Sequence, residues 1–257
     1  MLTIDLTGHI ALVLGGSRGI GAGIAEALCR AGAHVTFTHR GQAARRASVD
    51  ALIARASAGP GTVTPAVADA CSAADTARVV SEIVARHGRI DALVCNVGQT
   101  ARRPVDDVTE ESWRRFIDVN LTSSFLGVRA VVPHMTAAGR GRIILIGSSA
   151  VYDGGGGAID YASAKAGLQG MMLYLVRNYA RRGILTNIVH PCVIDTDLLR
   201  EGYDTAEKMD GLLRQIPVGR IGRPEDVGSL VAFLVSSFGD FVCGQSILVD
   251  GGRTLFG

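Results

Sequence analysis

Short apolar segments alternate with longer amphipathic segments along almost the whole chain. Seven of the short segments are rich in β-branched residues and show no polar–apolar alternation, which is typical of strands buried on both faces of a parallel sheet. They cover residues 10–15, 34–38, 62–67, 90–95, 142–147, 185–190 and 246–250. The pattern therefore predicts seven parallel strands.

The segments between these strands have the spacing of amphipathic helices. The clearest examples cover residues 19–32, 75–88 and 225–237, and several of them stop at glycine, a common helix C-terminal signal. Regular repetition of strand and helix predicts an α/β fold, namely a single-domain Rossmann-type doubly wound sheet of about seven parallel strands flanked by helices.

The domain organisation is simple. The 257 residues contain no linker, low-complexity tract or internal repeat, so one domain over residues 1–257 is expected. Only residues 195–222 interrupt the strand–helix rhythm, and this segment is long enough to form a substrate lid.

Composition and charge exclude several classes of protein. The net charge of +2 gives no electrostatic reason to expect nucleic acid or an anionic membrane as a partner. The five cysteines are scattered without a C-x-x-C pair and the six histidines lack metal-ligand spacing, so neither a disulfide framework nor a metal site is expected. No apolar run approaches the roughly 18 residues of a membrane span, and the N-terminus lacks a secretory signal. A soluble, cytoplasmic protein is expected.

The glycine-rich segment "LGGSRGIG" (14–21) follows the first predicted strand and opens the first predicted helix. Gly15, Gly19 and Gly21 allow the backbone to approach a pyrophosphate, while the helix N-terminus supplies free N–H groups and the positive end of the helix dipole. The segment therefore indicates a dinucleotide-binding loop. A tight glycine turn without a ligand is the alternative.

Tyr161 and Lys165 lie four residues apart in "DYASAKAG" (160–167), so on a helix they project from the same face among small neighbours. A phenol beside an ammonium can act as an acid–base pair. A nearby ammonium is expected to lower the pKa of the phenol from its usual value near 10. An exposed helical pair without a catalytic role is the alternative.

Six motifs occur in order along the chain: "GGSRGIG" (15–21), "CNVG" (95–98), Asn120, Ser148, "YASAK" (161–165) and "HPCVIDT" (190–196). Together they resemble the short-chain dehydrogenase/reductase family, and the resemblance extends to "GQSILVDGG" (244–252). It implies a catalytic tetrad of Asn120, Ser148, Tyr161 and Lys165 acting on a nicotinamide cofactor. In that tetrad Tyr161 is the acid/base, Lys165 binds the nicotinamide ribose, Ser148 polarises the carbonyl and Asn120 holds a water in a proton relay.

The same resemblance implies a cofactor site. The expected contacts are Gly15, Ser17, Arg18, Gly19, Ile20, Gly21, His39, Arg40, Asp69, Asn96, Gly98, Tyr161, Lys165, Pro191, Ile194 and Thr196. NADP is the expected cofactor, with NADPH preferred over NADH, because the second strand ends at His39 and Arg40 without an acidic residue that would repel a 2′-phosphate. Arg18 adds a second guanidinium. Solvent-facing arginines that tolerate both cofactors are the alternative, and Asp69 fits a turn aspartate equally well.

Four positions depart from the family's pattern. Leu14 replaces threonine at the start of the glycine loop, Cys95 and Val97 replace asparagine and alanine in "CNVG", and Cys192 replaces the glycine after Pro191. We expect lost local hydrogen bonds at Leu14 and Cys95, added bulk at Val97 and a narrower pocket at Cys192. The tetrad itself is intact.

The expected substrate is a small-molecule ketone or secondary alcohol, with a 3-oxoacyl thioester as one candidate and sugars, polyols or steroids as others. Arg129 and Arg177 fit either a basic surface for an acidic carrier protein or solvated helix charges. A non-catalytic dinucleotide-sensing regulator is a rival from another class.

Residues 112–135 and 168–180 have more apolar surface than one core contact needs, which together with the resemblance implies a homotetramer.

Overall fold

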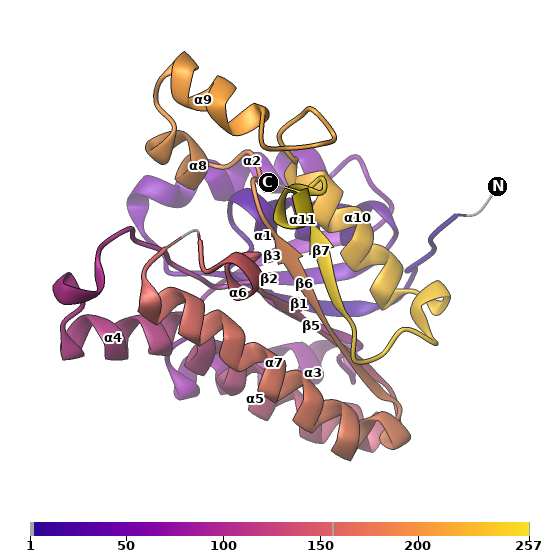
Figure 1. Cartoon of the computed structure of the whole chain (residues 1–257). Helices are drawn as coiled ribbons and strands as arrows, with labels where there is room; N and C mark the ends of the chain where they lie inside the picture. Colours follow the sequence, from indigo (N-terminus) through magenta and orange to yellow (C-terminus); the bar gives the residue numbers. More distant parts are fainter. Residues whose placement is uncertain (1–2, 156, 257) are drawn as a thin grey trace.

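The computed structural model describes residues 3–155 and 157–256, which contain one seven-stranded sheet (Figure 1). The strands are β1 (Ile10–Leu14), β2 (His34–His39), β3 (Thr62–Val67), β4 (Ala92–Cys95), β5 (Gly141–Ile146), β6 (Ile184–Pro191) and β7 (Ser246–Val249). Their order is β3-β2-β1-β4-β5-β6-β7, and every neighbouring pair is parallel. The predicted strands and fold class are confirmed, and no strand end differs from its predicted position by more than about two residues.

Helices cover both faces of the sheet (Figure 1). One face carries α1 (Gly19–Arg30), α2 (Arg46–Ala56) and α10 (Pro224–Val235). The other carries α3 (Ala73–His87), α5 (Ser123–Ala138) and α7 (Ile159–Tyr179). The short helical elements are η1 (Ala43–Arg45), η2 (Val105–Asp107), α4 (Glu110–Ile117), η3 (Asp118–Thr122), α6 (Ala150–Asp153), η4 (Ala180–Arg182), α8 (Asp197–Gly202), α9 (Ala206–Leu213), η5 (Ser237–Gly239) and α11 (Arg253–Phe256).

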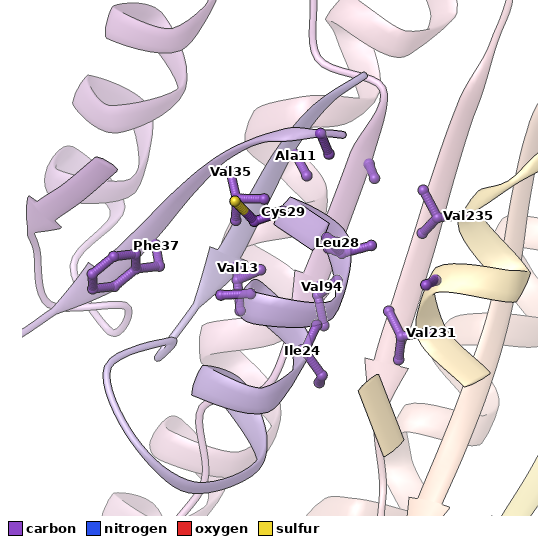
Figure 2. Packing of buried hydrophobic residues seen from close by; sticks show 14 of the residues in the cluster. Ala11, Val13, Ile24, Leu28, Cys29, Val35, Phe37, Val94, Val231 and Val235 are labelled. Atoms are coloured by element: carbon purple, nitrogen blue, oxygen red, sulfur yellow. The ribbon is translucent and has the colours of Figure 1, made fainter. Parts of the chain in front are cut away.

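The two hydrophobic cores explain why the central strands are apolar without interruption. In β1, Ala11 and Val13 pack into one core, while Ile10, Leu12 and Leu14 pack into the other. Because successive side chains of a strand point to opposite faces, a strand covered on both faces needs an apolar residue at every position. Figure 2 shows the first core, in which side chains of α1 and α10 meet those of β1, β2 and β4.

The edge strands are less buried than the pattern predicts. Residues of β3 are exposed or partly exposed throughout, and those of β7 are partly exposed. An edge strand has a neighbour on one side only, so it is covered less completely. Pro65 in β3 is compatible with this position, because a proline lacks the backbone N–H that an inner strand would use for pairing.

In the segment after β4, a regular α-helical repeat does not continue throughout residues 112–135. The chain instead runs through α4, a π-helical turn at η3, and α5. A π turn adds one residue to the helical repeat, and such turns occur frequently at functional sites. Here it includes Asn120, whose side chain is fully buried.

Residues 195–222 contain α8 and α9, which extend beyond the sheet (Figure 1). Ile194 and Gly222 form an isolated parallel bridge, and the backbone nitrogen of Asp195 donates to the carbonyl oxygen of Gly222 at 2.8 Å. The two ends of the segment are thus joined at its base. Its role as a lid stays a prediction. No helix within the described ranges combines the length and the apolarity needed to cross a membrane.

Candidate active site

The candidate site lies along the side of the sheet that is formed by the C-terminal ends of its parallel strands, which is called the sheet edge below. β1 is placed between β2 and β4, so the strand order reverses at this point. In doubly wound sheets, ligands bind beyond the C-terminal ends of the strands at such a reversal. The glycine loop follows β1, Ser148 follows β5 and Thr196 lies beyond the end of β6, so the topology brings these three segments to the same edge.

The glycine loop has a backbone conformation that requires glycine. Gly15 and Gly19 have φ angles of +76° and +52°, which side-chain-bearing residues rarely adopt. A Cβ atom on Gly21 would lie 2.2 Å from the carbonyl oxygen of Gly15. That same oxygen accepts a hydrogen bond of 2.8 Å from Nδ2 of Asn96, which links the loop to the end of β4.

The start of α1 is suited to a phosphate. The helix has no acidic residue in its first turn, and its capping residue, Arg18, makes no side-chain hydrogen bond to the free N–H groups. Those groups and the positive end of the helix dipole therefore remain available for an anion. The methyl group of Thr196 would lie 3.1 Å from a Cβ atom on Gly19, so the segment after β6 packs over the loop.

The other expected cofactor residues follow the ends of the neighbouring strands. In chain order they are Ser17 and Ile20 in the loop and α1, His39 and Arg40 at the end of β2, Asp69 after β3, Asn96 and Gly98 after β4, Pro191 at the end of β6, and Ile194 after it. Asp69 is exposed, and its Oδ1 accepts a hydrogen bond of 3.0 Å from the backbone nitrogen of Cys71. This is a turn contact that leaves the second carboxylate oxygen for a ligand.

Two arginines converge on Asp197 beside the glycine loop. Nη1 of Arg18 lies 3.6 Å and Nη1 of Arg45 lies 3.9 Å from the same carboxylate oxygen. Arg18 and Asp197 border a cavity of about 310 Å³ between α1, α2 and the segment after β6. Arg45, which lies in η1 after the loop that follows β2, was not among the residues predicted from the sequence.

Tyr161 lies in the first turn of α7 and is partly buried. Burial raises the pKa of its phenol, a hydrogen bond with the Ser148 side chain lowers it, and the nearby Cys192 raises it. The net shift is upward. The expectation of a lowered pKa is therefore wrong for the structure, because burial is the largest cause of the shift, and the phenol is protonated at neutral pH.

Lys165 lies one turn further along α7, with Nζ 6.0 Å from the centre of the Tyr161 ring. Its side chain is buried, and its ammonium donates a hydrogen bond of 2.8 Å to the carbonyl oxygen of Ile146 at the end of β5. Burial lowers the pKa of Lys165 to about 8. The group therefore remains mostly protonated at pH 7 while it lies close to its titration range.

Asn120 is tied to the loop after β4. Its Nδ2 donates to the carbonyl oxygens of Gln99 and Phe116 at 2.9 and 3.0 Å, and its Oδ1 accepts from the backbone nitrogen of Gln99 at 3.0 Å. A Cβ atom on Gly98 would lie 3.1 Å from Oδ1 of Asn120 and 3.3 Å from Nζ of Lys165. Gly98 therefore separates these two side chains, and a larger residue would crowd both.

His190 was missed by the sequence analysis. Its Nδ1 lies 3.2 Å from the backbone nitrogen and 3.0 Å from the carbonyl oxygen of Ser148, and its ring is 1% exposed. Burial lowers the pKa of the imidazole, so it is neutral. A Cβ atom on Gly147 would lie 2.4 Å from Nδ1. His190 thus supports Ser148 from β6, and its one sequence signal was its place directly before Pro191 at the end of a predicted strand.

A buried ion pair next to Tyr161 was also missed. Asp160 is fully buried and contacts Nη2 of Arg103, while its other oxygen accepts a hydrogen bond of 2.8 Å from the backbone nitrogen of Tyr161. The Arg103 guanidinium lies 4.6 Å above the centre of the Phe116 ring. The pair joins the loop after β4 to the start of α7, and its partners are 57 positions apart in the sequence.

The departures from the family's pattern are accommodated by packing. Leu14 is buried, and its Cδ1 would lie 2.7 Å from a Cβ atom on Gly127 of α5. The backbone nitrogen of Gly15 next to it donates instead to Oγ1 of Thr38 at 2.9 Å. Cys95 is also buried, and burial raises the pKa of its thiol to about 12. The Val97 side chain packs against the glycine loop, since its Cγ2 would lie 2.8 Å from a Cβ atom on Gly15.

Comparison with known proteins gives full-length matches. Residues 15–254 match the family model described as "Enoyl-(Acyl carrier protein) reductase". The 3-oxoacyl-[acyl-carrier-protein] reductase FabG of Escherichia coli is 38% identical over 249 residues, which cover 97% of this chain and 98% of the relative. The corresponding reductase of Thermotoga maritima is 34% identical over 250 residues, with coverage of 97% and 99%.

Solved structures agree with these matches. A dehydrogenase/reductase from Sinorhizobium meliloti 1021 has a TM-score of 0.88 and 34% identity, covering 98% of this chain and 97% of the other. A short-chain dehydrogenase/reductase from Serratia marcescens has a TM-score of 0.87 and 33% identity, with coverage of 97% and 99%. Both the fold and the sequence are thus similar along almost the entire chain.

Tyr161→Phe tests the role of the phenol. The substitution keeps the ring and removes the only proton that could be transferred, so turnover should fall at least about a hundredfold. The free energy of unfolding should change by less than about 1 kcal/mol. Steady-state kinetics and urea denaturation of both proteins measure the two effects. A Phe variant that retains most of its activity would exclude Tyr161 as the acid.

Lys165→Met tests the burial of the ammonium. Because the pKa of Lys165 is about 8 in the folded protein and near 10.4 in an unfolded chain, the unfolded state binds more protons between these values. The unfolding free energy of the wild type, relative to the Met variant, should therefore rise by roughly 1 kcal/mol per pH unit from pH 8 to 10. Lys208→Met on the exposed face of α9 is the matched control. A constant difference across this range for Lys165→Met would contradict the buried ammonium.

Proposed function

The chain belongs to the short-chain dehydrogenase/reductase family, and on that premise we propose that it is an NADP-dependent oxidoreductase that reduces a ketone or oxidises a secondary alcohol. The observation that carries the proposal is the convergence of Ser148, Tyr161 and Lys165 at the sheet edge that also carries the glycine loop. A 3-oxoacyl thioester is the first candidate substrate, because relatives of similar length carry the name 3-oxoacyl-[acyl-carrier-protein] reductase.

The residues present fit a nicotinamide dinucleotide. The glycine loop gives the close backbone approach that a pyrophosphate needs, and the uncapped N–H groups of α1 face the same edge. Arg18 and Arg40 would hold the 2′-phosphate, and Asp69 would hold the adenine amine. When bound, the cofactor supplies the hydride for reduction and accepts it in the reverse reaction.

Tyr161 would supply the proton. In reduction its phenolic proton passes to the carbonyl oxygen as hydride reaches the carbonyl carbon, and in oxidation the phenolate takes the proton back. The raised pKa of Tyr161 keeps the phenol in the protonated form that reduction uses. Ser148, whose side chain is near enough to the phenol to lower its pKa, would orient the carbonyl oxygen and stabilise the charge that develops on it.

Lys165 would stabilise the phenolate that remains after proton transfer. Its ammonium is held beside the ring by the carbonyl oxygen of Ile146, and an adjacent positive charge favours a phenolate. Asn120 would hold a water of the relay that returns a proton to Tyr161 and Lys165, since its side chain lies close to Lys165 across Gly98. The π turn at η3 directs Asn120 inward to this place.

We propose that the enzyme works as a homotetramer in the cytoplasm. Exposed apolar side chains lie on α5 at Phe125 and on α7 at Leu173 and Tyr174, where a second copy would cover them. Phe238 and Phe241, beyond α10, offer a separate exposed apolar area. The five free thiols suit a reducing compartment.

Turnover separates the enzyme from a dinucleotide-sensing regulator. NADPH oxidation is followed with a panel of 3-oxoacyl thioesters, quinones and sugars, alongside NADPH binding by fluorescence. Oxidation with a member of the panel supports the proposal and identifies the carbonyl class, including a sugar or polyol substrate. Tight binding of NADPH without oxidation by any member would favour a sensor.

NADPH should be preferred over NADH by roughly ten- to a hundredfold in kcat/KM, as expected for charge-assisted hydrogen bonds at a partly exposed site. The preference should weaken as salt rises. Arg40→Asp should reverse it, because a carboxylate repels the 2′-phosphate and binds ribose hydroxyls. Arg86→Asp on the exposed face of α3 is the control with the same charge change. A wild type that prefers NADH, or an Arg40→Asp variant with an unchanged preference, would overturn the assignment.

Multi-angle light scattering tests the assembly. A tetramer of the 26.8 kDa chain is expected at micromolar concentration. Phe125→Glu should shift the mass towards smaller species, because it places a charge in an apolar contact. A wild type that is a stable monomer would contradict the proposal.

A further inference from the structure

Arg253 follows a hydrogen-bonded turn at the end of β7. Gly251 and Gly252, after β7, have φ angles of +64° and +86°. The carboxylate of Asp250 accepts hydrogen bonds from the backbone nitrogens of Gly252 and Thr254 at 2.9 and 2.8 Å. These contacts determine where α11 begins, and therefore where the Arg253 side chain starts.

The guanidinium of Arg253 contacts three separate segments. Nη1 lies 3.2 Å from Sγ of Cys192 after β6 and 3.8 Å from Oδ2 of Asp153 in α6. Nη2 donates to Oε1 of Gln215, after α9, at 2.9 Å. Cys192 is close enough to Tyr161 to affect the pKa of the phenol. Cys192 follows β6 and Asp153 lies in the short helix after Ser148, so the guanidinium lies between two segments of the candidate site.

The Arg253 side chain is 24% exposed, and its guanidinium lacks a hydrogen-bonded carboxylate. Its Nε is buried and has no hydrogen-bond partner. Its contacts at 3.2 Å or less are to the Cys192 thiol and the Gln215 amide oxygen. The nearest carboxylate oxygen, that of Asp153, is beyond hydrogen-bond distance at 3.8 Å. Arg103 and Arg142, each 18% exposed, also have a buried Nε without a partner, but each makes direct contact with an aspartate. A partly buried cation that lacks a hydrogen-bonded anion is a favourable place for an anionic ligand.

We propose that Arg253 binds a free carboxylate of the substrate, so that the preferred ketone is an oxo acid. The inference rests on the proposed function, because it takes the reacting carbonyl to lie at Tyr161. The carboxylate would bind the guanidinium through charge-assisted hydrogen bonds, displacing the weaker contacts of Cys192 and Gln215. Asp153 competes for the same guanidinium and limits the affinity. Among 3-oxoacyl compounds, the free acid then replaces the thioester as the first candidate substrate.

The test compares an acid with its own ester. Wild type, Arg253→Met and Asp153→Asn are assayed with NADPH and either 3-oxohexanoate or ethyl 3-oxohexanoate. The ratio of kcat/KM for acid over ester should exceed one in the wild type. It should fall about ten- to a hundredfold in Arg253→Met, and rise severalfold in Asp153→Asn because the competing carboxylate is removed. Arg86→Met, which removes a charge from the exposed face of α3, should leave the ratio unchanged.

Calorimetric titration with the product pair, 3-hydroxyhexanoate and its ethyl ester, measures the same preference without turnover. Weaker binding of the acid to Arg253→Met, with unchanged binding of the ester, supports the proposal. A wild type that favours the ester, or the same ratio in wild type and both variants, overturns it. An enzyme that reduces the ester or a thioester better than the acid would contradict Arg253 as the anchor and leave the proposed reductase function standing. Absence of reduction of any carbonyl would instead remove the proposed function.

Discussion

The reversal of strand order between β1 and β4 determines where everything else in the candidate site can lie. Because all seven strands are parallel, their C-terminal ends meet at one edge, and the reversal separates the connections on either side of it. The glycine loop can approach that edge only because Gly15 and Gly21 leave no side chain between the end of β1 and the start of α1. Asn96 then hydrogen-bonds the loop across to β4. These contacts place a helix N-terminus, a source of partial positive charge, beside residues that follow β4, β5 and β6.

Burial then gives the tyrosine and lysine their chemistry. Removing a phenol and an ammonium from water raises the pKa of the first and lowers the pKa of the second, so both are displaced towards their neutral forms. The carbonyl oxygen of Ile146 compensates part of the cost of burying the ammonium. The result is a protonated acid next to a cation of reduced pKa, an arrangement suited to donating a proton to a carbonyl oxygen. Neighbouring side chains hold the backbone of Ser148 and of Tyr161 in place. His190 contacts the backbone of Ser148. Asp160, which is paired with Arg103, accepts a hydrogen bond from the backbone nitrogen of Tyr161.

The sequence predicted the parts of the structure that depend on local pattern. Uninterrupted apolar segments located every strand, and the glycine spacing located the start of α1. The π turn at Asn120 was not visible, because α4 and α5 have continuous helical spacing and the inserted residue depends on contacts with Gln99 and Phe116. The direction of the Tyr161 pKa shift was also wrong, since burial outweighs the charge that the spacing of Tyr161 and Lys165 suggests. Asp160 and Arg103, or Arg253 and Cys192, become partners only in three dimensions, so no short motif could identify them.

Transfer of a labelled hydride tests the central claim most directly. The protein is incubated with NADPH that carries deuterium at one face of nicotinamide C4 and with the carbonyl panel, and each alcohol product is analysed by mass spectrometry. The account predicts that deuterium from one face only is recovered on the carbinol carbon, with one equivalent of oxidised cofactor per alcohol formed. Oxidation of the cofactor without deuterium in the product, or no alcohol from any carbonyl, would contradict it.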